Sequence, residues 1–136
     1  MDDYPTDSWI MKIFEGWYDP CKISTNELRD FDGLDGSWED RSFINPPYSD
    51  PLPWVRNAII ENNKGKLVVL LLKMDTSTKW FAELQNAGAK FLWINGRLKY
   101  DTGKPAPFPS MIAILGKKEL PQQDIKLTKF EVKDGY

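Results

Sequence analysis

The 136-residue sequence has no histidine and only one cysteine, Cys21. Without histidine, imidazole general-base catalysis and the common His-containing zinc and iron sites are excluded. A single cysteine cannot form an internal disulfide, which favours an intracellular protein. No apolar run approaches the ~20 residues of a membrane helix, and the N-terminus has no signal-peptide pattern, so we expect no membrane partner. Asp and Glu are not clustered at a metal-binding spacing, so we expect no metal.

Charge is distributed unevenly along the chain. Residues 1–50 carry 12 acidic and 4 basic side chains, whereas residues 51–136 carry 8 acidic and 14 basic ones. The net charge of −2 argues against a strongly nucleic-acid-binding surface over the whole protein. The asymmetry is compatible with an acidic half that faces a cation and a basic half that faces an anion, or with an ordinary solvated surface.

The predicted elements alternate between strands and helices, which indicates an α/β fold in a single domain over residues 1–136. The clearest element is the apolar run 66–73, whose lack of alternation predicts a strand buried on both faces. Further strands are predicted at 41–44, 90–94 and 110–115, and another ends at Pro20. The tail, residues 116–136, is predicted to be an edge strand or a loose extension.

A helix is predicted on each side of the 66–73 strand. The start and stop signals are Ser49 or Asp50 with Gly65 for the first helix, and Thr76 or Ser77 with Gly88 for the second. Four aromatic side chains at core positions are predicted to be packed inside: Trp54, Trp80, Phe81 and Trp93.

These elements predict a mostly parallel sheet with helices on both faces. In such sheets ligands bind beyond the carboxyl ends of the strands. The segments 19–21, 45–48 and 73–76 each follow a predicted strand, so we expect them along one edge of the sheet. Three polar strand ends on one rim indicate a binding site there.

The stretch Asn45-Pro46-Pro47-Tyr48 directly follows the predicted strand 41–44. An exocyclic amino group on a nucleobase is a poor nucleophile, because its lone pair is delocalised into the ring. The Asn45 side-chain oxygen and a main-chain carbonyl, that of Pro46, would accept its two hydrogens and free the lone pair. The prolines would hold both oxygens in place in advance. Tyr48 would offer a flat face to a base taken out of its stack.

Seven pieces of the sequence, in order, resemble one family of enzymes. The pieces are TDSW, YDPC, FDGLDGSW, FINPPYSD, LLLKMDTSTKWF, INGRLKY and APFPSM. From about Thr6 to Leu115 the chain resembles the small phage-type DNA N6-adenine methyltransferases (the Dam family). The resemblance implies a reduced Rossmann-like fold, S-adenosylmethionine as cofactor and DNA as partner. It also implies a cytoplasmic enzyme, in the host cell if phage-encoded.

The resemblance implies roles for individual residues. Asn45, Pro46, Pro47 and Tyr48 take the catalytic positions, and Asn45 also faces the cofactor. The implied cofactor-binding residues are Thr6, Trp9, Asp19, Pro20, Cys21, Asp32, Gly33 and Leu34, with Asp32 meeting the adenine amino group of the cofactor. Two departures from the family pattern stand out. No glycine-rich turn follows Cys21, and only about 25 residues separate Cys21 from Asn45, so a reduced sheet is expected.

The segment 95–110 combines basic and aromatic residues with glycine and proline. Such a loop suits phosphate contact and base reading, although an ordinary solvated loop has the same composition. With the resemblance, we expect DNA contacts from Arg97, Lys99, Tyr100, Lys104 and Phe108. A homodimer or a partner subunit would supply recognition surface that a chain of this size lacks.

Alternative functions remain open at this point. The same chemistry serves cytosine N4, an RNA adenine or a protein glutamine amide, because each presents a planar NH2 group. A non-catalytic module that keeps the fold and binds nucleic acid is a further alternative. The presence of Asn45, Tyr48 and Asp32 argues against it. Cys21 is predicted to line the site and not to act as a nucleophile, since no histidine can activate it.

Overall fold

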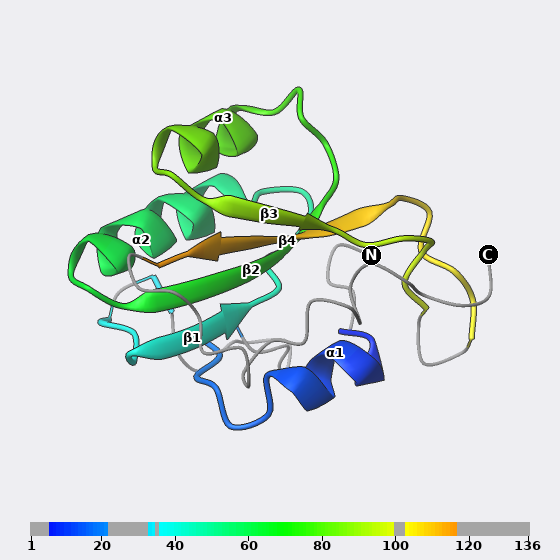
Figure 1. Cartoon of the computed structure of the whole chain (residues 1–136), viewed down its shortest axis with the longest axis horizontal. Coiled ribbons are helices and arrows are strands. Elements are labelled where there is room, and N and C mark those ends of the chain that lie inside the picture. The colour runs from blue at the N-terminus through cyan, green and yellow to red at the C-terminus, as the bar shows by residue number, and fades with distance from the viewer. Residues whose placement is uncertain (1–5, 22–32, 35, 100–102, 117–136) are drawn as a thin grey trace.

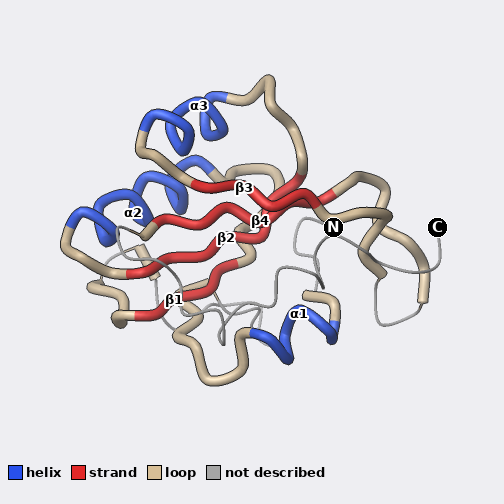
Figure 2. Tube along the Cα trace, in the orientation of Figure 1, coloured by secondary structure: helices blue, strands red, loops and turns tan. Residues whose placement is uncertain are grey.

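The computed structural model describes residues 6–21, 33, 34, 36–99 and 103–116. Within these ranges three helices and four strands form (Figures 1 and 2). Their bounds are α1 Ser8–Ile13, β1 Arg41–Ile44, α2 Leu52–Asn63, β2 Leu67–Lys73, α3 Lys79–Asn86, β3 Lys90–Trp93 and β4 Ser110–Leu115. The predicted strands agree with β1 and β4 at both ends, and with β2 and β3 to within one residue. The tail beyond Gly116 lies outside the described residues.

The four strands form one mixed sheet in the order β1-β2-β4-β3. β1 pairs with β2 in parallel, whereas β4 is antiparallel to both of its neighbours, β2 and β3. The prediction of a mostly parallel sheet was therefore wrong. The reason is the position of one strand: β1, β2 and β3 all run in the same direction, but β4 is inserted between β2 and β3 and reverses both of those pairings. In Figure 1 the arrow of β4 points opposite to those of β1 and β3.

A short extended segment continues the sheet beyond β1. Tyr18 forms an isolated parallel bridge with Ser42. The Tyr18 N–H donates to Arg41 O at 3.0 Å, and Phe43 N–H donates to Tyr18 O at 2.9 Å. The strand predicted to end at Pro20 is thus present as a single bridge, and Asp19 follows it at the same edge of the sheet as Asn45.

Helices α2 and α3 cover one face of the sheet and α1 covers the other (Figure 1). Because side chains alternate along a strand, β2 contributes to both sides. Val68, Leu70 and Leu72 belong to the cluster under α2 and α3, whereas Val69 and Leu71 belong to the cluster under α1. All five side chains are buried. The prediction of a strand buried on both faces is confirmed.

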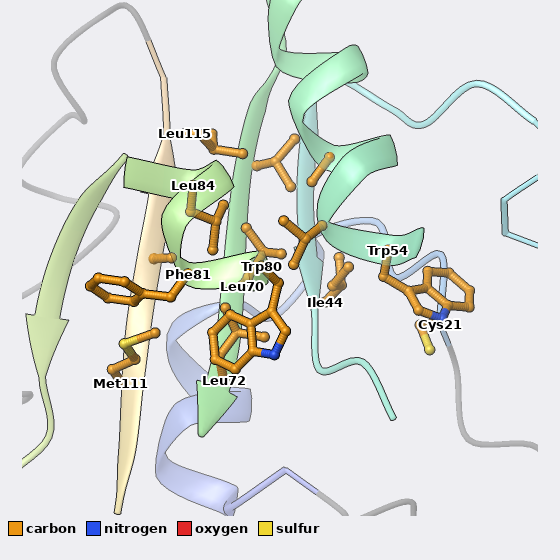
Figure 3. Close-up of a cluster of buried hydrophobic side chains, with 14 of the residues drawn as sticks. Cys21, Ile44, Trp54, Leu70, Leu72, Trp80, Phe81, Leu84, Met111 and Leu115 are labelled. Carbon is orange, nitrogen blue, oxygen red and sulfur yellow. The ribbon is translucent and has the colours of Figure 1, made fainter. Parts of the chain in front are cut away.

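The larger hydrophobic cluster lies between the sheet and helices α2 and α3 (Figure 3). Trp54, Trp80 and Phe81 are buried in it, as predicted. Trp93 is 49% exposed, so its predicted burial was wrong. Trp93 ends β3, the strand at the edge of the sheet, and its ring stacks on Phe91 with centroids 5.9 Å apart. One face of the indole therefore remains toward solvent.

The smaller cluster holds α1 against the opposite face of the sheet. Ile10 and Phe14 are buried there, and the Phe14 ring stacks on Phe43 with centroids 4.3 Å apart. Helix α1 has only six residues, too few for a clear helical period, and the sequence did not indicate it. Its packing fixes the segment that precedes it, Thr6 and Asp7, near the carboxyl ends of β1 and β3.

The helix ends follow the predicted glycines more closely than the predicted caps. Gly65 and Gly88 come two residues after α2 and α3 end and have positive φ angles of 98° and 83°. The N-cap of α3 is Thr78, not Thr76 or Ser77, and its hydroxyl accepts the Phe81 N–H. The N-cap position of α2 is Pro51, not Ser49 or Asp50, and no side chain caps that helix.

Candidate active site

The strand directions bring five chain segments to one rim of the sheet, where the strands start or end. β1, β2 and β3 end at this edge, the Tyr18 bridge is followed there by Asp19, and β4 begins there. The loop between β3 and β4 (residues 95–109, described at 95–99 and 103–109) extends beyond the same end of the sheet (Figure 1). The segments predicted to carry the cofactor, the chemistry and the substrate thus share one rim.

The stretch Asn45–Tyr48, called here the NPPY loop, leaves β1 without a break. The Asn45 Nδ2 group donates a hydrogen bond to Thr6 Oγ1 at 3.1 Å. Pro46 is buried, whereas Asn45 and Tyr48 are half-buried. Because proline fixes its own φ and restricts the residue before it, the two prolines limit the paths this loop can take. Asn45 is thereby held both through its main chain and through its amide.

The end of the NPPY loop contacts the loop between β3 and β4. The rings of Tyr48 and Phe108 lie with centroids 4.4 Å apart at an angle of 56°. Lys73, the last residue of β2, places its Nζ 5.9 Å from the centroid of the Phe108 ring. An aromatic pair with an adjacent ammonium group is thus present where the substrate residues were expected.

Five of the residues expected to bind the cofactor, Asp19, Pro20, Cys21, Gly33 and Leu34, lie together after the Tyr18 bridge. Asp19 Oδ1 accepts the Cys21 N–H at 2.9 Å, which turns the chain after the Tyr18 bridge. Gly33 lies against the main chain of Pro20, and a Cβ atom at Gly33 would overlap the Pro20 carbonyl oxygen. Cys21 is buried in the larger cluster near Trp54 (Figure 3), and Leu34 packs against that cluster.

Trp38 joins this group of residues to α2 and to Lys66, the residue just before β2. Its indole Nε1–H donates to Gly33 O at 2.6 Å, and its main-chain N–H donates to Glu61 Oε1 at 2.6 Å. Lys66 Nζ donates to the Trp38 carbonyl oxygen and, at 2.7 Å, to Glu61 Oε1. The buried Glu61 carboxylate thus fixes Trp38, and Trp38 in turn fixes Gly33.

The ionisation of Glu61 follows from these contacts. Burial raises the pKa of the Glu61 carboxyl, but hydrogen bonds from Lys64, Lys66 and the Trp38 N–H outweigh burial and lower the pKa to about 2. The side chain of Glu61 is 2% exposed, whereas that of Lys64 is 52% exposed. Glu61 is therefore a charged and fully partnered carboxylate, which fits a structural anchor.

The loop between β3 and β4 is closed on itself at its base. Lys99 and Pro105 form an antiparallel bridge, and the Ala106 N–H donates to Leu98 O at 2.7 Å. Arg97 Nη1 reaches the Ala106 carbonyl oxygen at 3.4 Å. The base of the loop also contacts the N-terminal segment, where Asp7 Oδ2 accepts the Lys99 N–H at 2.9 Å.

Some of the expected site residues are not brought into these contacts. Asp32 and Tyr100 lie outside the described residues. Trp9 is half-buried and packs against the smaller cluster under the sheet. Lys104 is exposed on the loop. Among the residues that the structure describes, no group of three or more His, Cys, Asp and Glu is placed to hold a metal ion.

The sequence did not indicate a role for three residues of this region: Asp7, Lys73 and Glu61. Asp7 and Glu61 act on main-chain N–H groups 92 and 23 residues away in the chain. No local sequence pattern predicts a contact between residues so far apart in the chain. Lys73 belongs to the predicted rim segment 73–76, and only the fold shows its position over Phe108.

Residues 15–122 match the family described as DNA N-6-adenine-methyltransferase (Dam). The chain belongs to the Dam family. The matched residues include the NPPY loop, all four strands and the loop between β3 and β4. Thr6 and Asp7 lie before the matched range.

Two curated phage proteins are similar to this Dam-family chain. A DNA N-6-adenine-methyltransferase of Haemophilus phage HP1 (strain HP1c1) is 32% identical over 114 residues, which cover 73% of this chain and 66% of that protein. A DNA N-6-adenine-methyltransferase of Escherichia phage T1 is 37% identical over 59 residues, which cover 43% of this chain and 25% of that protein. This chain thus spans about two thirds of the first relative and a quarter of the second. No solved structure matches the chain significantly.

No helix in the described part of the chain is long and apolar enough to cross a membrane.

Proposed function

We propose that the protein transfers a methyl group from S-adenosylmethionine to the N6 amino group of adenine in DNA. Membership of the Dam family supports the reaction class. The observation that carries the proposal is the placement of Asn45 at the carboxyl end of β1, hydrogen-bonded to Thr6, with Tyr48 against Phe108 beside it. A carboxamide acceptor and an aromatic face are the two groups that an extruded adenine requires.

Asn45 acts on the amino group of the base. The hydrogen bond from Asn45 Nδ2 to Thr6 Oγ1 uses the nitrogen side of the amide and so fixes the side on which Oδ1 lies. Oδ1 and the Pro46 carbonyl oxygen accept the two hydrogens of the target NH2 group. These contacts disfavour delocalisation of the nitrogen lone pair into the ring. Because both acceptors are positioned before the reaction, little reorganisation is needed at the transition state.

The residues at the rim fit S-adenosylmethionine. When bound, the cofactor supplies an electrophilic methyl group on a sulfonium. Gly33 and Pro20 are in main-chain contact, so two of the expected cofactor-binding segments lie together. Asp19, Cys21, Gly33 and Leu34 would hold the cofactor on this side, with Thr6 and Asn45 on the other. Within this set the Asp19 carboxylate and the polar groups of Thr6 and Asn45 suit a ligand with a sulfonium and an ammonium group, and Leu34 adds an apolar contact.

The loop between β3 and β4 contacts DNA in this proposal. Arg97, Lys99 and Lys104 would contact phosphates, whose neutralisation provides much of the binding free energy. Tyr48 and Phe108 would contact the extruded base, where base–aromatic stacking contributes ~1–3 kcal/mol. That stacking offsets part of the few kcal/mol needed to unpair and unstack the base. The earlier expectation of a homodimer or a partner subunit stays a prediction.

The test is a direct assay of methylated nucleosides. The purified protein is incubated with S-adenosylmethionine and unmethylated DNA, RNA or a glutamine-containing protein extract, and the products are digested and quantified by mass spectrometry. We expect N6-methyladenine in DNA, lost in Asn45→Ala and kept in Asn86→Ala, which truncates an exposed asparagine at the end of α3. N4-methylcytosine, methylated RNA or methylglutamine alone would identify another acceptor. Cofactor binding without any methylated product would overturn the proposal.

A further inference from the structure

The carboxylate of Asp7 bonds to a distant loop and not to the helix that Asp7 begins. Asp7 is the N-cap residue of α1, a position where an aspartate side chain normally accepts a main-chain N–H of its own helix. Here the side chain makes no capping hydrogen bond, although the main-chain oxygen of Asp7 accepts the N–H groups of Ile10 and Met11, as the first carbonyl of a helix usually does. Asp7 Oδ2 accepts the N–H of Lys99, in the loop between β3 and β4.

Three segments are joined in pairs at this edge of the sheet. Thr6 in the N-terminal segment accepts the hydrogen bond from Asn45 in the NPPY loop. Tyr48 in the NPPY loop packs on Phe108 in the loop between β3 and β4. The hydrogen bond between Asp7 and Lys99 joins that loop back to the N-terminal segment. Each of the three segments thus contacts the other two, next to the proposed reaction site.

The contact at Lys99 acts on the whole base of the loop. Lys99 bridges Pro105, and Leu98 accepts the Ala106 N–H at 2.7 Å, so the two sides of the loop are held together. Phe108 follows Ala106 by two residues. A displacement of Lys99 is therefore transmitted to the aromatic ring that packs on Tyr48.

We propose that Asp7 is a positioning residue that sets the loop between β3 and β4 against the NPPY loop, so that DNA is presented to Asn45. This role rests on the proposed function, since it names a further residue on which DNA presentation depends. Asp7 does not touch the reacting atoms; it acts through Lys99. Because Thr6 is adjacent to Asp7, the same short segment contacts the catalytic asparagine and the substrate loop.

The test compares Asp7→Ala with Asp7→Asn and with Asp40→Ala. Asn keeps an oxygen acceptor for the Lys99 N–H, and Asp40 is an exposed aspartate just before β1, at the other end of that strand. Amide hydrogen exchange of Lys99 and Ile112 is measured by NMR, together with kcat, the KM for DNA and the Kd for S-adenosylmethionine. These readouts separate a local loop effect from general destabilisation.

In Asp7→Ala we expect exchange at Lys99 to become about tenfold faster, and the KM for DNA to rise about five- to tenfold, the scale of losing one solvent-exposed hydrogen bond. Exchange at Ile112 in β4 and the cofactor Kd should change by less than about twofold, which lies within the scatter of unrelated surface changes. Asp7→Asn should restore most of both properties, and Asp40→Ala should match the wild type.

Two outcomes would overturn the role of Asp7. One is unchanged Lys99 exchange in Asp7→Ala, and the other is equal acceleration at Lys99 and Ile112. A wild-type protein that binds S-adenosylmethionine but methylates nothing would contradict the proposed function and not this contact. In that case Lys99 exchange and DNA binding by fluorescence anisotropy still decide whether Asp7 positions the loop.

Discussion

Gly33 lies so close to the main chain of Pro20 that a Cβ atom at Gly33 would overlap the Pro20 carbonyl oxygen. The edge of the Trp54 ring is 3.0 Å from the same position. Neither a carbonyl group nor a buried indole moves easily. The pair fixes the distance between two segments that we propose to bind the cofactor, and it explains why glycine is needed at a position without a positive φ angle.

The first prediction concerns Gly33→Ala. We expect the free energy of unfolding to fall by about 1–3 kcal/mol, the usual cost of overpacking. We also expect the affinity for S-adenosylmethionine to fall, because the segment at Gly33 must move away from Pro20. Gly36→Ala is the matched control, since nothing lies within 4 Å of its Cβ position. Urea denaturation and calorimetric titration measure the two effects. Equal behaviour of the two variants would contradict the close contact.

The second prediction concerns the pH dependence of stability that Glu61 imposes. Its pKa is lowered in the folded protein from 4.5 to about 2. A carboxyl with a depressed folded pKa stabilises the fold above its unfolded pKa, and this contribution is lost as the pH falls through the folded pKa. The free energy of unfolding should therefore decrease between about pH 4.5 and pH 2 by up to ~3 kcal/mol from this group.

Glu61→Gln isolates that contribution. The amide is close in shape but has no charge for Lys64 and Lys66, so the variant should be less stable at pH 7 by ~2–3 kcal/mol. Its stability should also vary less than that of the wild type between pH 4.5 and 2. Urea denaturation at several pH values gives both curves. Parallel curves would show that Glu61 is not the titrating group. Glu15→Gln, at an exposed glutamate, is the control.

The third prediction tests the contact between Tyr48 and Phe108. Aromatic pairs contribute about 0.5–1.5 kcal/mol beyond the area they bury. A double-mutant cycle of Tyr48→Leu and Phe108→Leu should therefore show a coupling of about 1 kcal/mol in the free energy of unfolding. A second cycle pairs Tyr48→Leu with Phe91→Leu, whose ring packs on Phe81 and Trp93 instead. Coupling of equal size in both cycles would rule out a specific contact.

The strands could be predicted well from the sequence, but their directions could not. The run 66–73 has no polar residue between the lysines at its two ends, so its ends and its burial on both faces could be predicted. The place of β4 between β2 and β3 depends on pairing across the sheet, which no local pattern records. Helix α1 was missed because six residues carry too little periodicity, and Trp93 was misplaced because edge strands expose one side.

The candidate site was predictable where its residues are contiguous. Asn45 to Tyr48 form one stretch, and the end of β1 places that stretch at the rim. Asp7 and Glu61 were not predictable, because each contributes through a main-chain N–H far away in the chain. For an acidic residue, charge alone does not distinguish a solvated side chain from an anchor. The role of each carboxylate becomes visible only when the fold places the Lys99 or Trp38 N–H group next to it.

The last prediction concerns the start of α3, where the sequence indicated Thr76 or Ser77 and the structure has Thr78. The Thr78 hydroxyl accepts the Phe81 N–H at 3.2 Å and donates to Asp75 O at 3.0 Å, so it links the connection after β2 to the helix. Thr78→Ala should lower the free energy of unfolding by about 1 kcal/mol, the usual effect of losing an N-cap. Thr76→Ala, at an exposed position, should change it by less than about 0.5 kcal/mol. Thermal or urea denaturation decides between them, and a larger loss in Thr76→Ala would return the cap to the position that the sequence indicated.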